Sequence, residues 1–148
     1  MGLIGSIASS ASGLAAQRVR MDTISGNVAN LDTTRSADGS GPYRRHVVRF
    51  SAGGEDAPFA QLVARFSGQP QGGVVLTQVE TDTTTPTRRS YDPSHPDADP
   101  DGFVELPNVD LVTEMTDLAS ANRSYQANVT VLNAVKQMAL RALDIGSR

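Results

Sequence analysis

The C-terminal stretch over residues 107–148 constrains the fold more than any other part of the sequence. One stripe of residues repeats there in alternating steps of four and three, interrupted by a single charge: Leu111, Met115, Leu118, Asn122, Tyr125, Val129, Leu132, Lys136, Ala139 and Leu143. This spacing indicates one face of a helix, and over several heptads it is typical of a coiled-coil seam. Pro107 suits the start of the helix, because proline has a fixed φ and no amide donor. Because isolated helices gain most of their stability from packing, such a helix requires a partner.

A second stripe at the opposite end of the chain supplies that partner. It also runs in steps of three and four, through Ile4, Ile7, Ala11, Leu14, Arg18, Met21, Ser25 and Val28. No proline interrupts the segment from Leu3 to Leu31. The sequence therefore predicts a mainly α fold in which long N- and C-terminal helices form an antiparallel coiled-coil hairpin around a small, irregular β-hairpin region. We expect the helices within residues 1–33 and 107–148, and the β-rich insertion over residues 34–106.

Both terminal segments are short of charge. No charged residue occurs from Met1 to Gln17 or from Ser124 to Val135. An amphipathic helix of a soluble monomer normally keeps a charged, solvated face. The composition therefore favours helices that are surrounded on most sides in an assembly, and an intramolecular hairpin with an uncharged surface is the alternative.

The middle of the chain has the composition of irregular β structure. Residues 43–50 and 73–79 are strand-like, because β-branched and aromatic residues are bounded there by Gly and Pro. Residues 61–66 form a weaker candidate strand, and residues 103–106 a short one. We expect residues 81–87 to be extended and exposed.

Composition excludes several classes of function. A net charge of −3 provides no basic footprint for nucleic acid. The absence of cysteine leaves neither disulfides nor thiolate metal ligands. No apolar run approaches the ~18 residues that span a bilayer, and the N-terminus lacks the basic region of a secretory signal. We therefore expect no membrane span and no cleaved signal peptide.

A partial calcium-loop pattern lies between Tyr91 and Asn108. Asp97, Asp99 and Asp101 alternate before a glycine, as the first ligands of an EF-hand loop do. The pattern then fails, because Asn108 stands where the bidentate Glu is required. The two histidines are not in metal-ligand spacing, and no phosphate loop or nucleophile elbow is present. We expect no cofactor, no metal and no enzymatic activity.

Several segments carry a family resemblance. Residues 24–33 (ISGNVANLDT), preceded by residues 12–17 (SGLAAQ), resemble the N-terminal signature of bacterial flagellar rod and hook proteins. Residues 121–128 (ANRSYQAN) resemble the C-terminal motif of the same family. Residues 91–104 (YDPSHPDADPDGFV), followed by residues 107–109 (PNV), resemble the proximal-rod type in particular.

The resemblance implies a structural subunit of the flagellar basal-body rod. Members of this family assemble helically with copies of themselves and with other rod proteins, and they transmit torque through the axial drive shaft. Their terminal helices form the inner tube and the β part lies outside. The family reaches the periplasm-spanning rod through the flagellar type III export apparatus, without a cleaved signal peptide. Two other functions remain open: another axial rod or hook component, and a soluble, calcium-regulated helical-hairpin binding module.

The candidate packing and assembly residues come from the two stripes and the two motifs. They are Ile4, Ile7, Leu14, Met21, Asn27, Val28, Asn30, Met115, Leu118, Asn122, Tyr125, Val129 and Leu132. The amides of Asn27 and Asn30 either bond across to neighbouring elements or cap the helix near Leu31. For Tyr125 we expect core packing rather than ligand binding.

Overall fold

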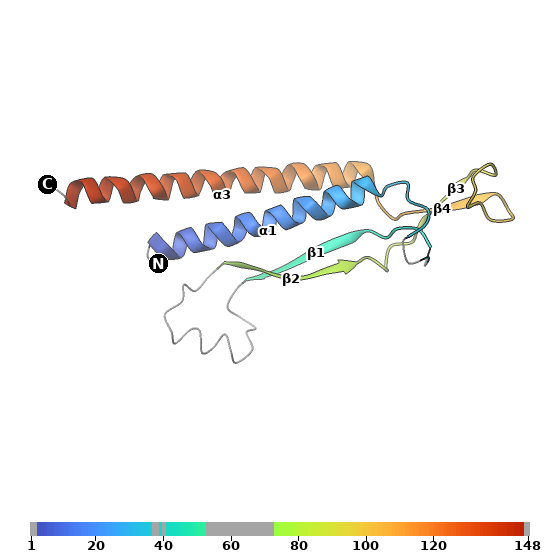
Figure 1. Cartoon of the computed structure of the whole chain (residues 1–148), viewed down its shortest axis with the longest axis horizontal. Helices are drawn as coiled ribbons and strands as arrows, with labels where there is room; N and C mark the ends of the chain where they lie inside the picture. The colour runs from blue at the N-terminus through green and yellow to red at the C-terminus, as the bar shows by residue number, and fades with distance from the viewer. Residues whose placement is uncertain (1–2, 37–38, 40, 53–72, 147–148) are drawn as a thin grey trace, which may run out of the picture. The chain divides into compact units, whose positions relative to one another are not determined.

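The computed structural model describes residues 3–36, 39, 41–52 and 73–146. Within them, helices α1 (Leu3–Ala29) and α3 (Leu111–Gly146) flank a region of short strands (Figure 1). The strands are β1 (His46–Ala52), β2 (Val74–Thr81), β3 (Arg88–Tyr91) and β4 (Phe103–Leu106). β1 pairs with β2, and β3 pairs with β4. The prediction of terminal helices around a small β region is confirmed.

Local capping explains where the helices begin and end. α3 starts at Leu111 and not at Pro107, because the carboxylate of Asp110 accepts a hydrogen bond of 2.8 Å from the amide of Thr113. That bond holds the pKa of Asp110 below its ordinary value. At the end of α1, the Asn30 side chain donates to the Gly26 carbonyl at 2.9 Å, so Asn30 caps its own helix.

The chain divides into two compact units. Unit 1 consists of residues 1–19, 49–78 and 120–148. Unit 2 consists of residues 20–48 and 79–119. Each long helix therefore contributes one part to each unit.

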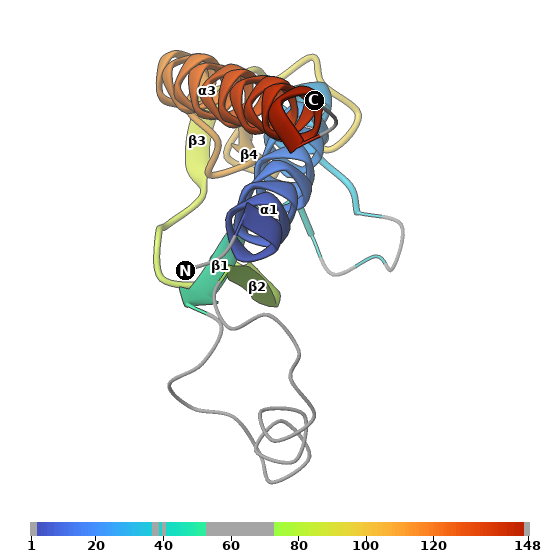
Figure 2. The ribbon, with the colours of Figure 1, turned by 90° about the vertical axis from the view of Figure 1, so that its left-hand side faces the viewer.

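In unit 1, α1 lies between α3 on one side and the β1–β2 ribbon on the other (Figures 1 and 2). A Cβ atom on Gly13 would lie 2.9 Å from Nδ2 of Asn128, so the glycine permits close approach of the helices. On the other side of α1, the amide of Val74 donates to the Ser12 hydroxyl at 3.0 Å. Gly73 precedes this contact with a φ of +134°, which favours glycine.

The most buried helix positions differ from the predicted stripes. In unit 1 they include Ala16, Ala121 and Val135, whereas Ile7 of the predicted stripe is 40% exposed. Four other predicted residues in unit 1 are half-buried, namely Leu14, Tyr125, Val129 and Leu132. Asn122 is exposed. The most buried positions on α1 therefore lie beside the predicted stripe, and α1 carries few charges to mark its solvent side. The Ile4 side chain lies outside the described residues.

Unit 2 shows the same difference. Glu114 is buried, at 1% exposed, while its neighbour Met115 is 59% exposed. Met21, Val28 and Leu118 are half-buried. The inward row of α3 is therefore displaced by one residue from the predicted one.

Strand β3 was not predicted, because its sequence Arg88-Arg89-Ser90-Tyr91 lacks an apolar pattern. It pairs antiparallel with β4, and the Tyr91 ring meets Phe103 edge-on at 5.3 Å between centroids. The strands predicted over residues 43–50 and 73–79 are present with shifted bounds, and the strand predicted over residues 103–106 is present with the same bounds. The candidate strand over residues 61–66 lies outside the described residues.

The segment before β3 forms a turn rather than a wholly extended chain. The Asp82 carboxylate accepts hydrogen bonds from the hydroxyls and amides of Thr85 and Thr84. These bonds, with the Thr85 hydroxyl foremost, hold the pKa of Asp82 well below its usual range.

The acidic loop that resembled a calcium site is held by ordinary loop contacts. The Thr34 hydroxyl donates to Asp97 at 2.8 Å, and Arg35 forms an ion pair with the same carboxylate. The Thr34 bond is the first cause of the lowered pKa of Asp97, with Arg35 also contributing. In the part of the chain that the structure describes, no three acidic, His or Cys side chains are grouped to hold a metal ion.

Gly102 provides a test of the β3–β4 turn. It has a φ of +79°, and a Cβ there would lie 2.9 Å from Cε2 of Tyr91. Gly39 has a similar φ of +72°, with no described atom within 4 Å of its Cβ position. We expect Gly102→Ala to lower the free energy of unfolding by more than Gly39→Ala, which should cost only the left-handed backbone term of about 1–2 kcal/mol. Urea unfolding measures both variants, and equal losses would contradict the steric contact.

Candidate functional site

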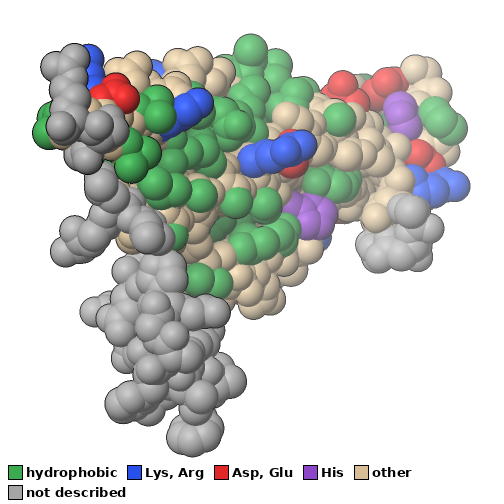
Figure 3. Space-filling model, turned by 60° about the vertical axis from the view of Figure 1, so that its left-hand side comes forward, with side chains coloured by type: hydrophobic (Ala, Val, Ile, Leu, Met, Phe, Trp, Pro, Cys, Tyr) green, Lys and Arg blue, Asp and Glu red, His purple; other side chains and the backbone are tan. Residues whose placement is uncertain are grey.

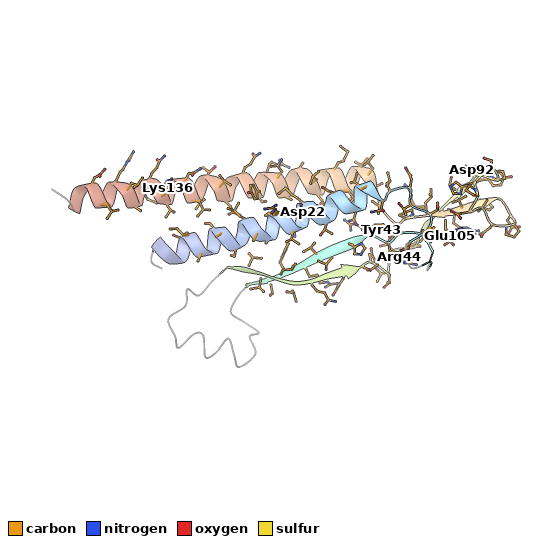
Figure 4. The ribbon with its side chains drawn as sticks, viewed as in Figure 1. Asp22, Tyr43, Arg44, Asp92, Glu105 and Lys136 are labelled. Carbon is orange, nitrogen blue, oxygen red and sulfur yellow. The ribbon has the colours of Figure 1, made fainter. Side chains whose placement is uncertain are left out.

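Polar side chains from distant parts of the sequence meet in unit 2. We call this cluster the polar node, and it consists of Asn27, Tyr43, Arg45, His46, Asn108 and Glu114. The last turns of α1, the segment entering β1 and the first turn of α3 supply most of it (Figure 4, where Tyr43 is labelled). Asn27 and Glu114 are each 1% exposed, and Asn108 is 8% exposed. Because burying polar groups is costly unless they are bonded, their partners decide whether the node is stable.

The Asn27 side chain pairs with the backbone of His46 at both of its polar ends. Its Nδ2 donates to the His46 carbonyl at 2.9 Å, and its Oδ1 accepts from the His46 amide at 2.9 Å. The amide side chain thus bonds to β1 as a neighbouring strand would. Of the two alternatives for Asn27, bonding across to another element is the observed one.

Tyr43 extends this network toward the His46 ring. Its hydroxyl lies 3.0 Å from Oδ1 of Asn27 and 2.6 Å from Nδ1 of His46. A phenol has one proton, so a Tyr43 that donates to Asn27 accepts its second bond from a protonated Nδ1. Burial raises the pKa of Tyr43, and the negative charge of Glu114 raises it further.

Glu114 is the buried carboxylate of the node. Its Oε1 accepts from Nε of Arg45 at 2.6 Å, and its Oε2 accepts from Nδ2 of Asn27 at 3.1 Å. Arg45 also reaches the exposed carboxylate of Asp117 at 3.4 Å. Both carboxylate oxygens of Glu114 are therefore bonded, which offsets the cost of removing the charge from water.

Asn108 completes the node from the opposite side of the Arg45 backbone. Its Oδ1 accepts from the Arg45 amide at 2.8 Å, while its Nδ2 donates to the carbonyls of Asp82 and Thr85 at 3.1 and 3.2 Å. Two asparagine side chains thus fix the backbone at positions 45 and 46.

The arrangement is suited to holding segments together. Its bonds link residues separated by as many as 87 positions in sequence, and they engage both amide ends of Asn27. Among the sequence candidates only Asn27 belongs to the node; Asn30 caps α1, and Met115 is exposed beside the buried Glu114. Of the missed residues, Asn108 lies in the family-like segment of residues 107–109, and the others lie in none of the family-like segments. One available signal was the heptad recurrence of Glu114, Ala121, Asn128 and Val135 along α3.

Removal of the Asn27 amide should destabilise unit 2. Asn27→Ala leaves the His46 backbone and one Glu114 oxygen without a bonding partner, so we expect the free energy of unfolding to fall by about 3 kcal/mol. Asn122→Ala is the matched control: its side chain is exposed, and the change should stay within about 0.5 kcal/mol. Urea unfolding of both variants tests this, and a small loss for Asn27→Ala would show that the node contributes little.

The raised pKa of Tyr43 predicts a loss of stability in alkali. The unfolded chain ionises this tyrosine near pH ~10, and the folded chain ionises it only at higher pH. The stabilisation is therefore fully present below about pH 10 and is lost as pH rises through the folded-state pKa. Tyr43→Phe should flatten this decline, whereas Tyr91→Phe, at a 66% exposed position, should preserve it. The free energy of unfolding is measured from about pH 9 to about pH 12, which is about two units above the ordinary tyrosine pKa. If its slope against pH stayed at the wild-type value in both variants, the assignment to Tyr43 would be contradicted.

Neither of the described helices combines the length and the apolar character needed to cross a membrane. Two family descriptions match the chain near its ends. Residues 7–35 match "Flagella basal body rod protein", and residues 101–145 match "Flagellar basal body rod FlgEFG protein C-terminal". These matches cover most of α1 and α3.

Curated relatives match over almost their whole length. The flagellar basal-body rod protein FlgC of Bacillus subtilis is 46% identical over 93% of each chain. The protein of the same name from Borreliella burgdorferi is 45% identical over 98% of each chain, and the one from Salmonella typhimurium is 42% identical over 91% of each chain. The chain therefore belongs to the family of the flagellar basal-body rod protein FlgC, which is structural and not enzymatic.

Proposed function

We propose that the chain is a subunit of the proximal rod of the bacterial flagellum, where it assembles helically with copies of itself and with other rod proteins and transmits torque. The relatives named FlgC support the rod over a different axial component. The observation that carries the proposal is the exposed apolar surface of the two helices. Torque then passes through many helix contacts, and no single residue carries it.

The exposed apolar surface is extensive on α3. Met115 is 59% exposed, Leu140 is 53% exposed and Leu143 is 70% exposed. Hydrophobic side chains gather over the helical part of the face shown in Figure 3. Large contiguous apolar patches mark interaction sites on soluble proteins, and subunits of an assembly bury such surface against their neighbours.

Within the subunit, the two helices form an antiparallel coiled-coil hairpin. Two contacts support this register: Gly13 with Asn128 in unit 1, and Asn27 with Glu114 in unit 2. From the first contact to the second, α1 advances by two heptads while α3 retreats by two heptads. A constant register in steps of seven is the spacing of a coiled coil.

The proposal also concerns location and delivery. As a rod subunit, the chain lies in the periplasm-spanning basal body and reaches it through the flagellar type III export apparatus without a cleaved signal peptide. Family membership supports this route. Mass determination of the chain recovered from basal bodies tests it, because cleavage would shorten the N-terminus.

Direct localisation tests the proposed function. Basal bodies extracted from the source organism with detergent, after removal of the filament, should contain this chain by mass spectrometry. Its absence from intact basal bodies would contradict the rod function and leave a helical-hairpin binding module to be pursued.

Met115 tests whether the exposed apolar surface is used in assembly. We expect Met115→Glu to reduce incorporation into rods about tenfold or more, because burying a methionine contributes about 1.5–3 kcal/mol and 1.4 kcal/mol corresponds to tenfold. Motility should fall with it. Thr116→Glu places the same charge at the next exposed position and should be tolerated. Both variants should unfold at the wild-type urea concentration; full motility with Met115→Glu would argue against this surface.

A further inference from the structure

Three stripes run along the part of α3 that lies in unit 1, one with members seven residues apart and two with members three or four residues apart. The inward stripe contains Ala121, Asn128 and Val135 and faces α1 of the same chain. An exposed polar ridge is formed by Arg123, Gln126, Thr130, Asn133, Gln137 and Arg141. The third stripe, which we call the outer stripe, consists of Ala127, Val131, Ala134, Met138, Ala142 and Ile145.

The outer stripe is apolar and open to solvent. Val131 is 46% exposed, Met138 is 53% exposed and Ile145 is 78% exposed. The three alanines are also exposed. A helix needs only one apolar stripe to pack against a single partner, and its remaining faces are normally polar. The inward stripe already packs against α1 of the same chain, so the outer stripe is available to a second helix.

A complementary row lies on α1 of the same unit. Ile7 is 40% exposed, and Ala11 and Ala15 are exposed at successive steps of four. These positions differ from Gly13, which contacts α3, and from Ser12, which contacts β2. No charged residue precedes Arg18, so this row carries no charge that burial would have to compensate.

We propose that the outer stripe of α3 in one copy of the chain packs against the Ile7–Ala11–Ala15 row of α1 in a second copy. This inference rests on the proposed function and names the partner of one of its surfaces. It is an interface between two different faces of identical subunits.

Length and symmetry favour this occupant. At about 1.5 Å per residue, the outer stripe is roughly 27 Å long and the charge-free part of α1 roughly 21 Å. The small side chains of α1 allow close approach to the larger Val131, Met138 and Ile145. A contact between unlike faces leaves one of each face free on every pair, so addition of copies continues, as a rod requires. Pairing of two outer stripes would instead close a two-fold dimer.

Cysteine cross-linking tests the interface cleanly, because the natural chain contains no cysteine. Cells co-produce Ala11→Cys chains with chains carrying Val131→Cys, Ala134→Cys or Met138→Cys, and isolated basal bodies are oxidised. Since each chain has one thiol, a disulfide between the two kinds must be intermolecular. We expect a shift to the mass of a dimer on a non-reducing gel for at least one of these pairs. The matched control pairs Ala11→Cys with Asn133→Cys on the polar ridge and should remain monomeric.

Other outcomes overturn the inference in distinguishable ways. Dimers formed by Val131→Cys alone would show pairing of like stripes. Motile cells whose rods contain the single-cysteine chains but give no cross-link at any outer-stripe position would refute this interface and leave the rod function intact. Absence of the wild-type chain from basal bodies would remove the rod function itself. As a second variant, Val131→Glu should lose incorporation into rods, whereas Asn133→Glu should retain it.

Discussion

The buried carboxylate of Glu114 sets the strongest requirement in unit 2. A charge removed from water is costly unless donors replace its hydration, and Arg45 and Asn27 supply those donors at 2.6 and 3.1 Å. Meeting that requirement brings together the end of α1, the entry to β1 and the start of α3. Asn27 and Asn108 then fix the backbone beside Arg45 and His46. One electrostatic demand thus orders segments that are far apart in the chain.

In unit 1 the constraint is steric rather than electrostatic. Gly13 has no side chain where Asn128 approaches, and Gly73 adopts a backbone conformation that places Val74 against Ser12. Close approach on these two sides of α1 leaves its third side open, where Ile7 is exposed. A fold that packs through small residues therefore keeps its larger apolar side chains available to neighbours, which is consistent with a subunit of an assembly.

Much of the architecture was predictable because it follows from local periodicity. Apolar residues spaced three and four apart indicate a helix regardless of which element it packs against, and β-branched runs bounded by glycine indicate strands. The candidate site was less predictable. Asn27 was among the residues predicted from the sequence, but Glu114, Arg45 and Asn108 were not, since these three meet only through tertiary contacts. Strand β3 was missed because its pairing with β4 stabilises a segment without strand composition.

Periodicity and composition specify two long, charge-poor helices around a β region, and the sequence motifs indicate the flagellar rod family. Which face of each helix turns inward follows from tertiary contacts. An apolar stripe indicates that a helix packs against a partner, but it does not identify the face that makes the contact. In addition, α1 has few charges to mark its solvent side. The choice came from single contacts, the close approach at Gly13 and the hydrogen bonds of Asn27, because short-range sterics and buried polar groups discriminate between faces that hydrophobicity leaves equivalent.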